Sequence, residues 1–142
     1  MLCGLQKLSP NKIRVRKSSP RLMVYDTSLM TYSEGSSRSL LIEDSAKRGH
    51  LVESAVGASL LARGKEEGFE TFWWRERDQE VDFVIQKGRR VTAIEVKSGR
   101  LKRLGGSMAF LKEFPEAMSL VVGSQSITLE AFLSGEVPLF KE

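Results

Sequence analysis

One stretch of the chain, VDFVIQKGRRVTAIEVKSG at residues 81–99, constrains the fold more than any other. Two apolar runs rich in β-branched residues flank a basic turn with a glycine, which predicts a β-hairpin. Each run also carries charge: Asp82 in the first, and Glu95 and Lys97 in the second. Because side chains alternate along a strand, Glu95 and Lys97 share one face. A two-residue turn pairs residues whose numbers have an odd sum, which places Asp82 on that same face.

The patterns around this hairpin predict an α/β fold. Asp26 can cap the turn that follows a short strand at 21–26. From residue 44 on, the predicted order is α-β-β-β-α-β-α, with Ser45 as the N-cap of the first helix and Gly64 at its end. These elements cover residues 45–63, 70–75, 80–86, 90–97, 105–114, 118–123 and 127–135. We therefore expect a mixed central sheet flanked by helices.

Length and composition fit one globular domain. The chain has 142 residues, of which 41% are hydrophobic and 28% are charged. No apolar run approaches the roughly 20 residues that span a bilayer, and no signal-peptide core is visible. The single cysteine, Cys3, excludes an internal disulfide and a Cys-rich zinc site. We therefore expect a protein of the reducing cytoplasm with no membrane partner.

Positive charge is concentrated in two segments, although the net charge is only +4. Residues 1–21 hold six basic and no acidic residues, and residues 87–103 hold seven basic residues and one acidic residue. Such clusters fit a nucleic-acid partner, but an ordinary solvated surface explains them as well. The expected phosphate contacts are Arg89, Arg90, Arg100, Lys102 and Arg103.

The first 20 residues show no periodic apolar pattern. We expect residues 1–20 to be a basic arm, or the remnant of an upstream region, that packs weakly or pairs with a neighbouring chain. The domain itself is expected to cover residues 21–142.

Three carboxylates are expected to meet on the hairpin face. Glu53, on the helix predicted at 45–63, lies near Asp82 and Glu95 if that helix packs on the sheet. Burying such a cluster is costly without a cation, and Mg²⁺ or Mn²⁺ prefers oxygen ligands. Lys97 can then orient a water molecule or neutralise charge on a phosphate. The simpler interpretation of the Glu-x-Lys spacing is a solvated sheet face with an ordinary salt bridge.

The same residues resemble the signature of the PD-(D/E)XK nuclease superfamily. GHLVES supplies Glu53, EVDFVI supplies Asp82, and IEVKSG supplies Glu95 and Lys97. The resemblance implies a restriction-endonuclease-like core of order αβββαβ, here with one more C-terminal helix. It implies metal-dependent hydrolysis of DNA or RNA, with Glu53, Asp82 and Glu95 as metal ligands and Asp82, Glu95 and Lys97 as catalytic residues. Val81 stands where the superfamily name has proline, at a position that supports the backbone.

A closer resemblance covers about residues 18–135. Six segments in order look like the C-terminal domain of bacterial and archaeal AAA-type ATPases, known as domain of unknown function 4143. The segments are SSPRLMVYDTSL, GHLVESAVGASLL, WWRERDQEVDFVI, AIEVKSG, FLKEFP and LEAFLSG. Gly64-Lys65 lacks both the preceding glycine and the following Ser or Thr of a phosphate-binding loop, so ATP hydrolysis is not expected of this chain.

The resemblance leaves two functions open. One is a nuclease, and the other is a non-catalytic nucleic-acid-binding or regulatory domain that serves an ATPase module or partner chain. Self-association is compatible with both.

Other features allow two interpretations each. Trp73 and Trp74 can stack on bases, but they face opposite sides of one strand, so at least one belongs to the core. Glu80 is either a further metal ligand or a surface charge. Gly105-Gly106 opens a helix and is either a phosphate site or a hinge.

Overall fold

The protein has an α/β fold, in a computed structural model that describes residues 2–10, 16–24, 26–28, 44–97 and 105–141. Its strands and helices are β1 (Leu2–Lys7), β2 (Arg21–Val24), α4 (Ser45–Glu67), β3 (Glu70–Glu76), β4 (Gln79–Lys87), β5 (Arg90–Val96), α5 (Gly105–Glu113), β6 (Met118–Val122) and α6 (Leu129–Leu133). From α4 on, the predicted order of elements is confirmed.

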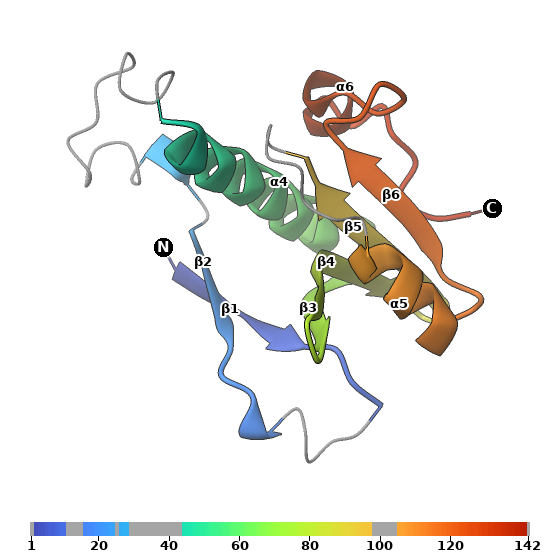
Figure 1. The fold of residues 1–142 in the computed structure, drawn as a ribbon. Helices are drawn as coiled ribbons and strands as arrows, with labels where there is room; N and C mark the ends of the chain where they lie inside the picture. The colour runs from blue at the N-terminus through green and yellow to red at the C-terminus, as the bar shows by residue number, and fades with distance from the viewer. Residues whose placement is uncertain (1, 11–15, 25, 29–43, 98–104, 142) are drawn as a thin grey trace.

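The strands form one six-stranded mixed sheet in the order β2-β1-β3-β4-β5-β6 (Figure 1). Strand β4 runs antiparallel to both β3 and β5, whereas β1 is parallel to β3 and β6 is parallel to β5. Strand β2 extends the sheet beyond β1 as an antiparallel edge strand. The mixed central sheet expected from the sequence is therefore confirmed. Strand β2 corresponds to the short strand predicted at 21–26, and β1 is one further strand ahead of it.

Both faces of the central strands are buried. Phe83 of β4 and Ile94 of β5 pack in a core that also includes side chains of α4 and α6. Val84 and Ala93, the next positions on the same strands, pack on the other face with Phe110 of α5. Side chains of one strand thus serve two cores, as the period of two requires.

Helix α4 begins and ends at other residues than the sequence predicts. Its N-cap is Asp44 rather than Ser45, and the Asp44 carboxylate accepts hydrogen bonds from two backbone N–H groups of the first turn, at 2.9 and 3.2 Å. The helix continues through Gly64, because residues 65–67 are good helix formers, and ends at Gly68, whose φ of 74° suits glycine. Although α4 has 23 residues, no helix in the described ranges is long and apolar enough to cross a membrane.

The turn after β2 is capped as predicted. Asp26 accepts hydrogen bonds from the hydroxyl of Ser28 at 2.6 Å and from its backbone N–H at 2.9 Å. These hydrogen bonds favour the ionised carboxylate and so lower the pKa of Asp26.

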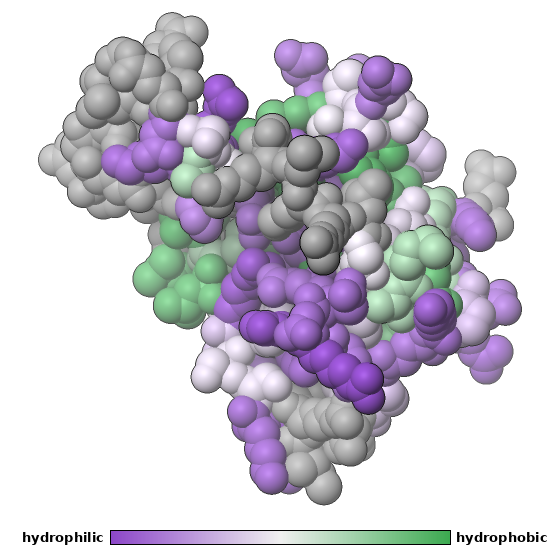
Figure 2. Space-filling model, viewed as in Figure 1, coloured by the Kyte–Doolittle hydropathy of each residue, from purple (hydrophilic) through white to green (hydrophobic). Residues whose placement is uncertain are grey.

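The first strand corrects the expectation of a loosely packed N-terminus, which is wrong for Leu2–Lys7. Strand β1 lies between β2 and β3, and Leu5 belongs to the main core. Its other side chains are only partly buried or exposed, so no alternation marks the strand in the sequence. Leu2 and Leu22 remain exposed, and Figure 2 shows apolar surface over this β1–β2 hairpin.

The place of β1 in the sheet predicts unequal effects for two leucines of the same strand. Leu5 is 2% exposed and Leu2 is 66% exposed. We expect Leu5→Ala to lower the free energy of unfolding by about 2–5 kcal/mol, because it opens a cavity in the core. Leu2→Ala should change it by less than about 0.5 kcal/mol. Urea denaturation measures both, and equal effects would show that β1 does not pack as described.

Candidate functional site

The hairpin of β4 and β5 carries two buried acidic residues on neighbouring strands. Paired residues run from Lys87 with Arg90 to Phe83 with Ile94, so the predicted odd-sum register is confirmed. The next residues along, Asp82 and Glu95, are only 4% and 7% exposed. The two acidic residues therefore lie on neighbouring strands, at the end where the regular pairing of the hairpin stops.

Each of these carboxyl groups accepts a hydrogen bond from the backbone of another element. Oδ2 of Asp82 accepts from the N–H of Val96 at 2.9 Å, where the regular pairing of β4 and β5 ends. Oε1 of Glu95 accepts from the N–H of Ser107 at 2.6 Å, in the first turn of α5. A carboxylate at a helix N-terminus satisfies a donor that the helix cannot use. Both side chains are therefore held in fixed positions.

The start of α5 lies directly on β4. A Cβ atom added to Gly106 would be 1.8 Å from the carbonyl oxygen of Glu80 and 3.0 Å from Oε1 of Glu95. Only glycine permits this approach. Of the two glycines that open the helix, Gly106 therefore has a packing role, which brings the N–H of Ser107 to Glu95.

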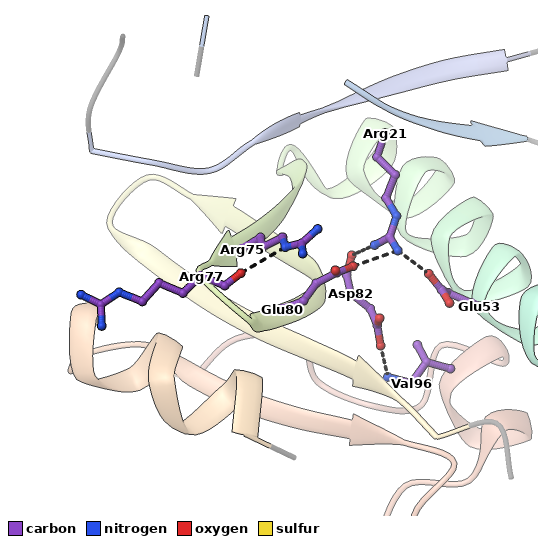
Figure 3. A network of polar contacts seen from close by, with 7 residues as sticks. All are labelled: Arg21, Glu53, Arg75, Arg77, Glu80, Asp82 and Val96. Carbon is purple, nitrogen blue, oxygen red and sulfur yellow. Dashed lines mark hydrogen bonds and ion pairs between the residues drawn. The ribbon is translucent and has the colours of Figure 1, made fainter. Parts of the chain in front are cut away.

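Arg21 of β2 connects three parts of the site (Figure 3). Its Nη2 forms ion pairs with Glu53 of α4 at 3.1 Å and with Glu80 of β4 at 3.0 Å. Its Nη1 donates a hydrogen bond to the backbone oxygen of Asp82 at 3.2 Å. One guanidinium thus ties the edge strand to α4 and β4 and provides the positive charge that two carboxylates need.

Glu53 forms an ion pair with Arg21, whereas the sequence predicted that it would join Asp82 and Glu95 in a cluster of three carboxylates. Within the ranges that the structure describes, no group of three or more His, Cys, Asp or Glu side chains lies together in a way that could hold a metal ion. Asp82 and Glu95 remain as two buried acidic residues on neighbouring strands. Glu80 pairs with the same guanidinium, in keeping with its interpretation as a charge near the surface.

Lys97 follows directly after β5. Its backbone N–H donates to the oxygen of Val122 at 2.8 Å, which fixes the main chain at this point. The side chain is exposed, and by strand alternation it lies on the face of Glu95. The amine is therefore open to solvent, at the end of β5 that carries Glu95.

Of the five basic residues predicted to bind phosphate, the structure describes Arg89 and Arg90. Arg89 and Arg90 lie at the hairpin turn, at the opposite end of β5 from Lys97. A strand of this length spans roughly 20 Å. Arg90 also donates to the backbone oxygen of Lys141 at 3.4 Å and lies over the ring of Phe140. Arg100, Lys102 and Arg103 lie outside the described residues.

Sequence reasoning assigned no role to Arg21. The residue is the first of a short strand and was visible only as one of six basic residues near the N-terminus. Its partners are more than 30 positions away in the chain, and no local pattern predicts such a contact. The N–H of Ser107 was missed for the same reason, although the Gly-Gly pair before it marked the start of the helix.

A family model described as a domain of unknown function (DUF4143) matches residues 48–131, which is more than half of the chain. The chain belongs to the DUF4143 family. No curated protein matches it. In this DUF4143 protein the matched range contains Glu53, Asp82, Glu95 and Lys97, whereas Arg21 and strands β1 and β2 precede it.

Gly105 and Gly106 provide a matched pair for testing how the DUF4143 domain builds this site. Ala at position 106 would meet a backbone oxygen of β4, whereas Ala at 105 would meet only the flexible end of Gln79. We expect Gly106→Ala to lower the free energy of unfolding by about 1–3 kcal/mol through overpacking. Gly105→Ala should be near neutral, because the gain in helix propensity offsets a small side-chain shift. Denaturant titration compares the two, and a tolerated Gly106→Ala would contradict the close contact.

Proposed function

We propose that this DUF4143 domain is a divalent-metal-dependent nuclease of the PD-(D/E)XK type, acting on phosphodiester bonds of DNA or RNA. The observation that carries the proposal is the presence of two buried acidic residues, Asp82 and Glu95, on neighbouring strands, with the exposed Lys97 two residues after Glu95. Two buried carboxylates on neighbouring strands repel each other when both are ionised, and a hard cation between them removes that cost. The restriction-endonuclease-like fold is part of the same proposal, supported by the order of elements from α4 to β6.

Asp82 and Glu95 fit a magnesium or manganese ion chemically, because they offer hard oxygen donors. One oxygen of each carboxyl group accepts a hydrogen bond from a backbone N–H. This hydrogen bond orients the group and uses only one of its two oxygens. One oxygen of Glu53 is paired with Arg21, so the guanidinium competes with an ion for this carboxylate. When bound, the ion would supply positive charge against the phosphate oxygens and activate water for attack.

The chain's own residues would do the remaining work. The N–H groups of Val96 and Ser107 hold the two carboxylates in place before substrate arrives, so little reorganisation is needed. Lys97 would place its exposed amine against the phosphate and stabilise the negative charge that grows during the reaction.

A second candidate function has its own observation. Every acidic residue of the site has a structural partner: Glu95 caps α5, Asp82 joins β5, and Glu53 and Glu80 pair with Arg21. Fold stability alone can therefore explain these residues. On that account the domain binds nucleic acid without cutting it, or regulates an ATPase module or partner chain.

Metal binding and cleavage distinguish the two functions. We expect Glu95→Gln to reduce Mn²⁺ affinity in calorimetry and to abolish cleavage, while the amide oxygen keeps the hydrogen bond from Ser107. Lys97→Ala should still bind Mn²⁺ but cut about 10²–10³-fold more slowly, because it removes charge stabilisation alone. Lys112→Ala, at an exposed lysine of α5, is the charge-matched control and should cut normally.

The substrates are single- and double-stranded DNA and RNA, with Mg²⁺ or Mn²⁺. A folded protein that binds neither ion and cuts none of these substrates would establish the non-catalytic function instead.

A variant of Arg21 tests whether Glu53 is a metal ligand. The guanidinium competes with a divalent ion for the Glu53 carboxylate, so we expect Arg21→Gln to raise Mn²⁺ affinity several-fold. The metal-free protein should lose no more than about 1 kcal/mol of stability, because these ion pairs are partly exposed. Adding Glu53→Gln to that variant should cancel the gain. If Arg21→Gln leaves the affinity unchanged, Glu53 is not a ligand.

A further inference from the structure

A small pocket lies at the ends of β3 and β4, on the part of the sheet nearest to β2. It has a volume of about 230 Å³ and is lined by Arg21, Trp73, Arg75 and Glu80. Arg75 and Glu80 are opposed residues of β3 and β4, and Arg21 reaches Glu80 from β2. Figure 3 shows these three side chains converging over the same ends of the strands. Since a water molecule takes about 30 Å³ of liquid, the pocket has room for a phosphate group.

Trp73 provides a donor that lacks an acceptor. Its Nε1–H is buried, and no atom of the described residues accepts a hydrogen bond from it. A buried N–H without a partner is unfavourable, so an acceptor brought by a ligand would be bound with a gain. Trp74, the next residue, faces the other side of the sheet, where it packs edge-on against Phe110.

The lining carries more positive than negative charge. Two guanidiniums, of Arg21 and Arg75, face the single carboxylate of Glu80. Two charged residues lie just beyond the lining: Glu53 pairs with Arg21, and the amine of Lys7 lies 5.8 Å from the centre of the Trp73 ring. Counting these two with the lining, three positive charges face two negative charges.

Arg75 is the guanidinium that is available to a ligand. Its Nε donates to the backbone oxygen of Arg77 at 3.2 Å, and no carboxylate of the described residues forms an ion pair with it. Its two terminal nitrogens form the fork that suits two oxygens of a phosphate.

We propose that this pocket binds one backbone phosphate of a nucleic-acid strand, with Arg75 and the Trp73 N–H as its donors. The choice of a nucleic acid rests on the proposed function, whereas the anion site itself does not. Arg21 lines the pocket and also donates to the backbone oxygen of Asp82. A phosphate held there therefore lies beside the strand that carries the candidate cleavage site, and it would position the substrate.

The two indole N–H signals in a ¹H–¹⁵N NMR spectrum test the anion site directly. Sodium phosphate is titrated into the metal-free protein at constant ionic strength, with sodium chloride as the control, and Trp73→Phe assigns the signals. We expect the Trp73 signal to shift and saturate with phosphate, while the Trp74 signal stays in place. No shift of Trp73, or equal shifts of both signals, would overturn the site.

Two arginines that lie close together in the sequence provide matched variants. Arg75→Gln should weaken phosphate binding about tenfold, because it removes the charged donor. Arg77→Gln should leave the affinity unchanged, since Arg77 does not line this pocket and keeps the backbone oxygen that Arg75 uses. Equal losses in the two variants would show a general charge effect and overturn the specific site.

The source of the phosphate is tested with labelled single-stranded DNA and RNA in EDTA, against a phosphoserine peptide. We expect the oligonucleotides to shift the Trp73 signal, to be displaced by phosphate and to bind less tightly to the Arg75→Gln variant. Tighter binding of the peptide would overturn the nucleic-acid assignment. Because no metal is present, these results do not depend on cleavage. A protein that never cuts but shows the Trp73 response would refute the proposed nuclease activity and not the pocket.

Discussion

The register of β4 against β5 is the constraint on which the rest of the structure depends. A slip of one residue would turn Phe83 and Ile94 out of the core under α4 and would separate Asp82 from Glu95. The tight turn at Gly88, whose φ is 60°, fixes this register together with the apolar residues on both faces. The same geometry that fills two cores therefore brings two acids together at the end of the hairpin.

The network around these acids shows how the fold accommodates them. Backbone N–H groups serve Asp82 and Glu95, and one arginine serves Glu53 and Glu80. A carboxyl group has two oxygens and can accept several hydrogen bonds, so a structural contact and a ligand contact are compatible on one side chain. The two proposed functions therefore share the same structural contacts. They differ only in whether the carboxylate oxygens also bind a metal ion.

Local patterns predicted what depends on local chemistry. The period of two in β4 and β5 and the turn glycine predicted the hairpin, and the order of elements after residue 44 followed from similar signals. The N-cap of α4 was misplaced by one residue because Asp44 and Ser45 are both good caps. Strand β1 was missed because its partner in β3 is more than 60 residues away, and only Leu5 is fully buried. The contacts of Arg21 also join residues that are far apart in the sequence, so local patterns could not predict the charges around the site.

The β1–β2 hairpin precedes the range that matches the family, yet it supplies Arg21 and Lys7. The range that matches the family model thus provides acids and an amine, while the residues ahead of it provide the counter-charge and the nearby cations. A relative with the same core and a different N-terminal segment would present its acids to solvent with another charge balance. Chemical behaviour within this family should therefore be compared among proteins grouped by the segment that precedes the core, and not by the core alone.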